Sequence, residues 1–238
     1  MRMRKKKNAA ARLDACRELI LEKPASPMIS PSKALGMAGA PVYLEIGAGK
    51  GGFATQMAKR HGGVSYFAME RVSDCVVLAA ELAKRCRDEG RDNLRFIIDG
   101  ADSLAEWFAK GSVDRIFLNF SDPWSKKGYA KRRLTHRKYL AIYMNLLKDG
   151  GSLCFKTDNT GLFDFSIEEI EAVGLKCDAL TRDLHSSEYA AENIMTEYES
   201  AFVAEGMKIN MLRVTKPSGF TVPMPPTNVR RGENEYGN

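Results

Sequence analysis

The stretch VYLEIGAGKGGF, residues 42–53, decides the fold class of this chain. Its first five residues are apolar except for Glu45, which is typical of a short strand buried on both faces. Gly47, Gly49 and Gly51 follow at every second position, and a helical pattern then begins. A strand, a glycine loop and a helix in this order are typical of the first unit of a Rossmann-like α/β fold.

The alternation of strand and helix patterns continues along the chain. Strands are predicted over residues 42–46, 64–70, 94–98, 113–120 and 151–157, with two closing strands over 175–184 and 197–206. Helices are predicted over 9–22, 51–61, 72–88, 102–109, 134–147 and 161–172. Because such crossovers place strands in parallel, we expect a doubly wound, mostly parallel seven-stranded sheet with helices on both faces.

Length and charge limit the domain organisation and the class of partner. The chain has 238 residues, which suits one large domain, and its net charge of +6 favours a polyanionic partner. Five of the first seven residues are Lys or Arg. We expect a basic arm and linker over residues 1–40, a main domain over 41–215 and a disordered tail over the Pro- and Gly-rich residues 216–238.

Cysteine, histidine and hydropathy patterns argue against several other classes. The five cysteines form no C-x-x-C pair, and the three histidines complete no metal-ligand spacing. The basic N-terminus is not followed by an apolar h-region, so we expect no signal peptide, and the sequence contains no run of 18 apolar residues. We therefore expect a cytoplasmic protein that binds no metal and spans no membrane. Whether it is a monomer or a homodimer stays open.

The glycine loop is compatible with three ligand states. A P-loop is excluded because Gly49-Lys50 is followed by Gly51 rather than Ser or Thr. A nicotinamide dinucleotide would use Glu70 for its ribose, but Glu45 adds negative charge where a pyrophosphate needs positive potential. S-adenosylmethionine has no phosphate and carries two cationic groups, so Glu45 favours it, with Glu70 accepting from the ribose. A tight turn that binds nothing is the remaining alternative.

A second loop combines an acid with a basic cluster. NFSDPW, residues 119–124, ends the fourth predicted strand, and seven of the residues from 126 to 138 are Lys or Arg. Pro123 biases Asp122 toward an extended conformation. We expect Asp122 to project over the methyl group of the cofactor, while the cations that follow contact RNA phosphates.

More acids follow the later predicted strands. Asp158 follows the fifth strand, and Thr196, Glu197 and Glu199 lie near the last one. Because carboxylates are pure acceptors, these residues could bind the N1–H and N2 edge of guanine.

With these motifs the chain resembles the bacterial tRNA (guanine-N7-)-methyltransferases. The resemblance runs from residue 1 to about residue 205. The matching stretches are MRMR (1–4), LEIGAGKG (44–51), AME (68–70), LNFSDPWSKK (118–127), KRRLT (131–135), FKTDNTGLF (155–163) and NIMTEYE (193–199). It implies an S-adenosylmethionine-dependent methyltransferase domain over residues 41–215. That domain would methylate N7 of a guanine in the variable loop of tRNA and release S-adenosylhomocysteine.

The resemblance also implies roles for individual residues. The donor would be lined by Glu45, Gly47, Gly49, Glu70 and Asp122, and Asp122 would be catalytic. The target nucleotide would contact Lys126, Asp158, Thr196, Glu197, Tyr198 and Glu199. The RNA backbone would meet Gly128, Tyr129, Ala130, Lys131, Arg132 and Arg133.

Two positions depart from the family pattern. Gly100 stands where the family often has an Asp before Ala101, so the adenine would be met by the main chain at Gly100 and Ala101 or by a shifted Asp99. DPWS also replaces the more usual DPWP.

Two other functions remain compatible with parts of the pattern. A non-catalytic RNA-binding protein on the same fold needs only the basic arm and loop. A nicotinamide-dependent oxidoreductase would use Glu70 and the glycines, but we find no hydride-transfer residue in a recognisable setting.

Overall fold

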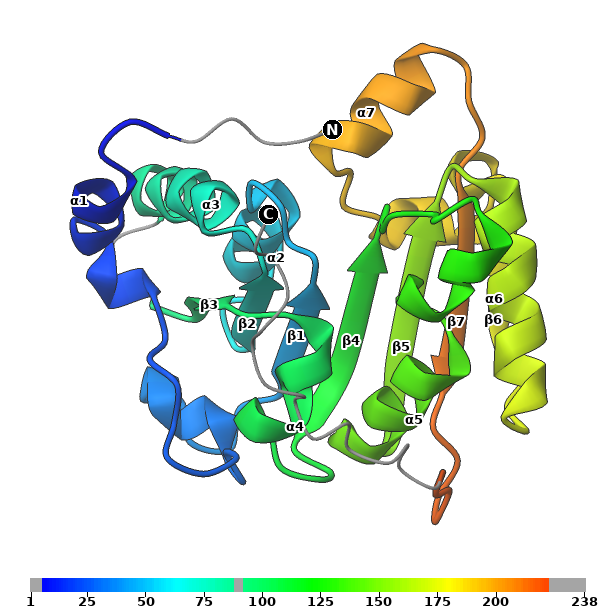
Figure 1. Cartoon of the computed structure of the whole chain (residues 1–238), viewed down its shortest axis with the longest axis horizontal. Helices are drawn as coiled ribbons and strands as arrows, with labels where there is room; N and C mark the ends of the chain where they lie inside the picture. Colours follow the sequence, from blue (N-terminus) through cyan, green and yellow to red (C-terminus); the bar gives the residue numbers. More distant parts are fainter. Residues whose placement is uncertain (1–5, 88–91, 223–238) are drawn as a thin grey trace, which may run out of the picture.

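Seven strands form one sheet in the order β3-β2-β1-β4-β5-β7-β6 in a computed structural model of the chain, which describes residues 6–87 and 92–222 (Figure 1). The strands are β1 Val42–Ile46, β2 Ser65–Glu70, β3 Leu94–Ile98, β4 Val113–Asn119, β5 Leu147–Thr157, β6 Ala179–Thr181 and β7 Asn210–Thr215. Strands β1 to β5 pair in parallel, and β7 runs antiparallel to both β5 and β6. The prediction of a Rossmann-like, mostly parallel sheet is confirmed.

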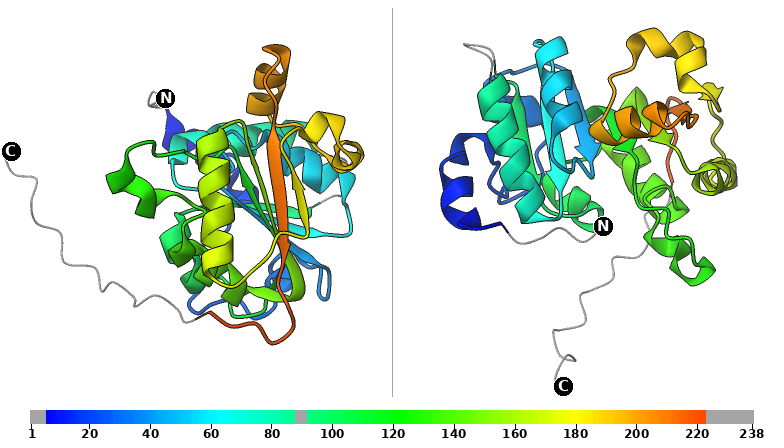
Figure 2. Two further views of the ribbon diagram at one scale, coloured as in Figure 1. Left: turned by 90° about the vertical axis from the view of Figure 1, so that its right-hand side faces the viewer. Right: turned by 90° about the horizontal axis from the view of Figure 1, so that it is seen from above.

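Helices cover both faces of the sheet, as Figure 2 shows edge-on and from above. They are α1 Ala9–Asp14, α2 Gly52–Arg60, α3 Ser73–Cys86, α4 Leu104–Trp107, α5 Arg137–Leu146, α6 Thr160–Ala172 and α7 Glu197–Ala204. One buried cluster contains side chains of α4, α5 and α6, and the other contains those of α2 and α3. Successive residues of a strand point to opposite faces, so both clusters receive side chains from the same strands.

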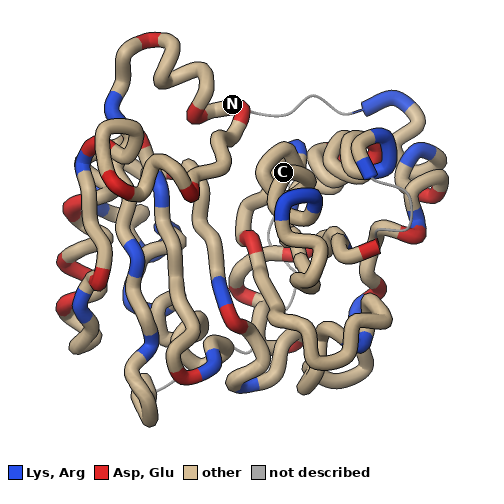
Figure 3. Tube along the Cα trace, turned by 180° about the vertical axis from the view of Figure 1, so that it is seen from behind, with Lys and Arg blue, Asp and Glu red and all other residues tan. Residues whose placement is uncertain are grey.

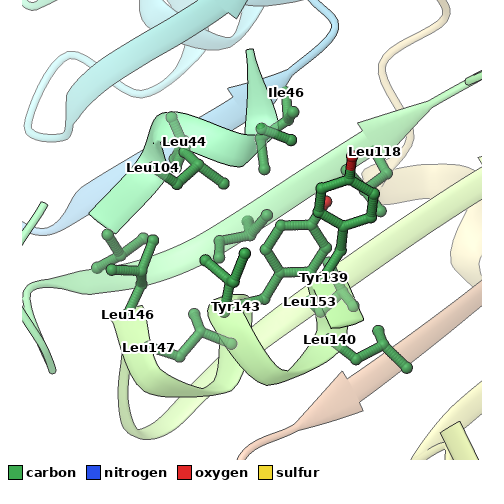
Figure 4. Close-up of a cluster of buried hydrophobic side chains, with 14 of the residues drawn as sticks. Leu44, Ile46, Leu104, Leu118, Tyr139, Leu140, Tyr143, Leu146, Leu147 and Leu153 are labelled. Atoms are coloured by element: carbon green, nitrogen blue, oxygen red, sulfur yellow. The ribbon is translucent and has the colours of Figure 1, made fainter. Parts of the chain in front are cut away.

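The first cluster lies between α5 and the sheet. Tyr139, Leu140 and Tyr143 of α5 lie against Leu44 and Leu118 of β1 and β4 (Figure 4). These residues recur at helical spacing along RKYLAIYMNL, which explains why the segment is a helix with one apolar face. Each such side chain contributes about 1.5–3 kcal/mol by its burial.

The segment between β6 and β7 differs from the prediction. The strand predicted over residues 197–206 is wrong, because α7 occupies Glu197–Ala204 and the last strand is β7. The Thr196 side chain accepts from Glu199 N at 3.0 Å, and Glu199 Oε2 accepts from Thr196 N at 3.3 Å. This reciprocal pair is a capping box, and it starts a helix at a sequence that otherwise resembles a strand.

Two other predicted elements are shorter than expected. The strand predicted over 175–184 is reduced to β6, and the helix predicted over 9–22 divides into α1 and a 3₁₀ turn at Arg17–Leu19. The turn is followed by a single parallel bridge between Ile20 and Phe96 of β3.

The segment predicted as a basic arm is fixed against α3 where it is described. Arg12 makes two hydrogen bonds of 2.7 Å to the Glu81 carboxylate, and Lys84 Nζ donates to Ala15 O. Residues 1–5, which carry three of the five cations at the start of the predicted basic arm, lie outside the described residues.

The segment predicted as a disordered tail begins with ordered packing. Lys216 is buried and donates to Leu147 O at 2.8 Å, and Phe220 and Val222 pack against the first cluster. Residues 223–238 of the predicted tail lie outside the described part of the chain.

Within residues 6–87 and 92–222, every helix is too short or too polar to span a lipid bilayer.

Two glycines of the loop after β1 provide a test of helix packing. Both have positive φ, but a Cβ on Gly51 would lie 2.6 Å from Ala79 Cβ of α3, whereas a Cβ on Gly49 would meet nothing within 4 Å. We expect Gly49→Ala to lower the free energy of unfolding by about 1–2 kcal/mol through backbone strain. Gly51→Ala should lower it by a further ~1–3 kcal/mol through overlap.

Urea unfolding of the two variants without ligand measures this difference. Equal losses would show that α2 and α3 can separate without cost.

Candidate active site

The glycine loop lies against the carboxylate of Glu70. Gly49 N donates to Glu70 Oε2 at 3.0 Å, and Val72 N donates to Glu70 Oε1 at 2.8 Å. The acid at the end of β2 therefore holds both the loop and the start of α3. Each carboxylate oxygen can accept a further hydrogen bond, so Glu70 can still receive a ligand hydroxyl.

Glu45 is a buried acid at the end of β1, with only 2% of its surface exposed. Its Oε1 accepts from Asn119 Nδ2 of β4 at 2.9 Å, while its Oε2 is buried without a hydrogen-bond partner in the described structure. Burial raises the pKa of Glu45 to about 7, against the opposing effects of the Asn119 bond and the charge of Lys156. An unpaired buried acceptor calls for a donor from outside the chain.

The loop after β4 is strained and carries a free acid. Phe120 and Trp124 adopt positive φ values of 50° and 43°, which bulky residues rarely take. Asp122 lies between them, exposed and without a hydrogen bond or ion pair to any described residue. Such strain persists only where the surroundings enforce it, and it clusters at functional sites.

Arg133 enforces this loop conformation. It donates to Pro123 O at 3.0 Å and to Trp124 O at 3.2 Å, and its guanidinium lies over the Phe165 ring at 4.3 Å. Arg133 was predicted to meet the RNA backbone, but here its donors hold the Asp122 loop. Its neighbour Arg132 lies over the Trp124 and Tyr129 rings at 5.0 and 4.7 Å.

The remaining cations of this loop are exposed. Lys126, Lys127 and Lys131 form no hydrogen bond or ion pair through their side chains in the described structure, and Gly128 lies exposed between them. Tyr129 and Ala130 complete the turn. In the view of Figure 3 acidic and basic residues are interspersed along the chain, so it is the local run of exposed lysines, rather than the net charge, that is typical of a polyanion-binding surface.

Two groups were predicted as alternatives to contact the adenine: Asp99, or the main chain at Gly100 and Ala101. Asp99 Oδ2 accepts from Trp107 Nε1 at 2.9 Å, and its Oδ1 accepts from Gly100 N at 2.8 Å. Burial acts to raise the pKa of Asp99, but these bonds outweigh it and lower the pKa overall. Each Asp99 oxygen can accept a further hydrogen bond, whereas Gly100 N–H is already used by Asp99, so the Asp99 oxygens and the main-chain N–H of Ala101 are the groups left for a ligand.

The residues of the TEYE stretch divide into two groups. Glu197 is exposed and lies beside the glycine loop, with its Oε2 at 3.3 Å from Lys50 Nζ. Tyr198 is 61% exposed. Thr196 and Glu199 are buried and form the capping box, so they do not face a ligand.

The predicted site residues therefore gather at one edge of the sheet. Helix α7 stands beyond the arrowheads of β4 and β5 (Figure 1), and Phe120 of the Asp122 loop packs against Phe202 of α7 with ring centroids 5.9 Å apart. Asp158, half-buried at the end of β5, has no hydrogen-bond partner among the residues described.

Lys156 and Asn119 are polar residues of this site that sequence reasoning missed. Lys156 is 6% exposed and donates to Glu199 Oε2 at 2.6 Å. The available signal was a lysine within the apolar strand GSLCFKT, because an unpaired lysine is almost never fully buried.

Comparisons with known proteins give a consistent match. A family model described as a putative methyltransferase matches residues 39–212. The tRNA (guanine-N(7)-)-methyltransferase of Halalkalibacterium halodurans is 39% identical over 209 residues, which cover 88% of this chain and 93% of the relative. The enzyme of the same name from Lachnoclostridium phytofermentans is 46% identical over 172 residues, covering 72% of this chain and 79% of the relative.

Solved structures match in fold. The 16S rRNA methyltransferase KamB aligns with a TM-score of 0.58 at 11% identity, covering 83% of this chain and 99% of that one. The antibiotic-resistance methyltransferase Kmr aligns with a TM-score of 0.57 at 16% identity, covering 84% and 99%.

Glu45→Gln tests the state of the buried acid. The raised pKa means that folded wild-type protein binds more protons than unfolded protein between about pH 4.5 and 7, so its stability falls as pH rises through this range. Gln does not ionise, so the variant should gain on the order of 2–3 kcal/mol relative to wild type between pH 5 and pH 8.

Urea unfolding at the two pH values measures this gain. An unchanged difference between variant and wild type at pH 5 and pH 8 would show that Glu45 titrates normally.

Proposed function

Because this chain belongs to the bacterial tRNA (guanine-N7-)-methyltransferase family, we propose that its methyl-donor site lies across the ends of β1 and β2 and that its target guanine lies in the variable loop of tRNA. The chain is an enzyme that transfers a methyl group from S-adenosylmethionine to N7 of a guanine in tRNA. The products are 7-methylguanosine in the tRNA and S-adenosylhomocysteine.

The observation that carries the donor site is the buried, unpaired Oε2 of Glu45 beside an open glycine loop. Gly47 and Gly49 have positive φ, and a Cβ on either would meet nothing within 4 Å. The donor has a cationic ammonium and sulfonium, which suit a carboxylate, and no phosphate, which the acid would repel. Glu70 has acceptor capacity left for the ribose, and the main chain at Ala101 or the Asp99 carboxylate would meet the adenine.

Asp122 is the proposed catalytic residue. Guanine N7 has a lone pair and no proton, so no base is needed, and the methylated ring becomes cationic. The bound donor supplies an electrophilic methyl group. A carboxylate that lies free at the loop tip would stabilise positive charge as it grows in the transition state. Holding two reactants in line supplies ~7–11 kcal/mol, so the Arg133-held loop and the glycine loop act mainly by positioning.

Two exposed or half-buried acids suit the guanine edge. Asp158 has no partner in the described chain, and Glu197 has only an exposed ion pair with Lys50, so both can accept from N1–H and the N2 amino group. Tyr198 offers an exposed ring for stacking. Thr196 and Glu199, which the family resemblance also places at the nucleotide, would act indirectly by ordering α7.

The exposed lysines suit the tRNA backbone. Lys126, Lys127 and Lys131 lie four, five and nine residues after Asp122 in the same connection, so phosphates bound there would bring a base near the acid. The N7 atom lies on the major-groove edge, which regular A-form RNA hides, so a base in a loop is the fitting target. We place this reaction in the cytoplasm, where tRNA is modified.

Labelled methyl incorporation tests the proposed function. Purified protein, unmodified tRNA and methyl-labelled donor should yield labelled 7-methylguanosine on nuclease digestion. If instead calorimetry shows tRNA binding but no heat with the donor, the chain is a non-catalytic RNA-binding protein.

Asp122→Ala isolates the catalytic role. We expect turnover to fall by at least about 10²-fold, because a charge-stabilising group is lost, while the affinity for tRNA stays nearly unchanged. Glu168→Ala, at an exposed acid of α6, is the matched control and should retain full turnover. Wild-type turnover in Asp122→Ala would remove Asp122 from the mechanism.

Lys131→Ala and Arg133→Ala separate phosphate binding from loop support. Lys131→Ala should weaken tRNA binding and reduce the slope of log affinity against log salt by about 1, as expected for one lost phosphate contact. Arg133→Ala should lower turnover by loosening the Asp122 loop, with the salt slope nearly unchanged. Filter binding from 50 to 300 mM salt gives both slopes, and identical behaviour of the two variants would contradict this division.

A further inference from the structure

Lys156 is a buried cation with all of its hydrogen-bonding capacity used. Its ammonium donates to Glu199 Oε2 at 2.6 Å, to Asn193 Oδ1 at 2.8 Å and to Ile194 O at 2.9 Å. Three acceptors match the three donors of an ammonium group. The Phe53 ring of α2 lies 5.2 Å from Nζ. This complete set of contacts describes a built position rather than an incidental one.

Glu199, which accepts the shortest of these bonds, also has several partners within the chain. Glu199 is fully buried, and besides Lys156 its carboxylate accepts from Asn193 Nδ2 at 2.5 Å. His185 Nε2 lies 3.0 Å from Oε1 of Glu199. Glu199 also forms the capping box with Thr196. A carboxylate with these partners faces the protein interior, so its place in the TEYE stretch calls for a structural explanation.

Lys156 also lies next to a residue that contacts Glu45 of the proposed donor site. It lies beside Asn119 in the register between β5 and β4, and Asn119 donates to Glu45. The charges of Lys156 and Glu45 influence each other. The groups that face Glu45 are Asn119, Lys156, Glu70 and the buried Tyr66. Lys156 is the cation among them.

We propose that Lys156 is a positioning residue for methyl transfer: bonded to Glu199 and paired in register with Asn119, which donates to Glu45, it orders α7 and supports a charged Glu45 beside the donor. This inference rests on the proposed function. Lys156 then has two effects. It anchors α7, which presents Glu197 to the guanine, and it favours the ionised form of Glu45, which meets the cationic donor.

Two measurable consequences follow from this position. Burial raises the pKa of Glu45 to about 7, and the charge of Lys156 opposes that rise. Donor affinity should rise with pH as Glu45 ionises. Without the cation Glu45 should ionise at a higher pH, so the rise in donor affinity should occur at a higher pH than in wild type. Without the anchor, α7 should be misplaced, and a misplacement of about 1 Å can cost roughly 10²-fold in rate.

The test uses three variants of the full chain. Lys156→Met removes the cation but keeps the length of the side chain. Because that leaves the buried Glu199 carboxylate without its lysine partner, the double variant Lys156→Met/Glu199→Gln removes both charges and should fold. Lys216→Met is the matched control. Lys216 is also buried, donates to Leu147 O at 2.8 Å and lies 3.3 Å from Asp149, at the opposite end of β5.

Calorimetry with S-adenosylhomocysteine and S-adenosylmethionine from pH 6 to 9 gives the midpoint pH of the rise in donor affinity. Steady-state assays give kcat and the KM for tRNA. We expect Lys156→Met and the double variant to raise this midpoint by about one pH unit or more, because they remove a nearby opposite charge that favours ionised Glu45. Turnover should fall by about 10²-fold. Lys216→Met should change only thermal stability.

The outcomes separate this inference from the proposed function. A wild-type protein that binds donor and methylates tRNA, together with a folded double variant that keeps the wild-type midpoint and turnover, overturns the role of Lys156 alone. A wild-type protein that neither binds donor nor methylates tRNA overturns the proposed function.

Discussion

The parallel pairing of β1 with β2 on one side and β4 on the other is the constraint on which the site depends. It brings the ends of three strands to one edge, so that Glu45, Glu70 and Asn119 lie together although they are distant in sequence. Parallel strands of a doubly wound sheet open a crevice at this edge, beyond their carboxyl ends. The glycine loop, the Asp122 loop and α7 all extend from it, and the proposed donor and base meet there.

The site stores free energy that a purely structural fold would not need. Glu45 is buried with an unpaired oxygen, Lys156 and Glu199 form a buried ion pair, and Phe120 and Trp124 hold strained backbone. A buried ion pair seldom adds net stability, and a strained residue costs about 1–3 kcal/mol. Such features fit a site in which arrangement matters more than stability.

Much of the fold could be predicted from sequence, because buried parallel strands are continuous apolar runs separated by helical patterns. The strand predicted over residues 197–206 is wrong because the T-x-x-E capping signal, Thr196 to Glu199, starts a helix there. At the site, residue types were informative but orientations were not. Glu199 and Arg133 have the chemistry of ligands for a nucleotide and a phosphate, yet the first faces Lys156 and the second faces main-chain carbonyls. Only the packing of distant segments decides this.

The central claim is that donor and guanine meet at this edge beside Asp122. A crystal structure of the full chain with S-adenosylhomocysteine and tRNA tests it most directly. We expect the ribose at Glu70, a guanine from the variable loop with N7 facing the sulfur, and the Asp122 carboxylate within a few ångströms of that base. A complex in which the guanine lies on another face of the sheet, or in which Asp122 points away from both ligands, would contradict it.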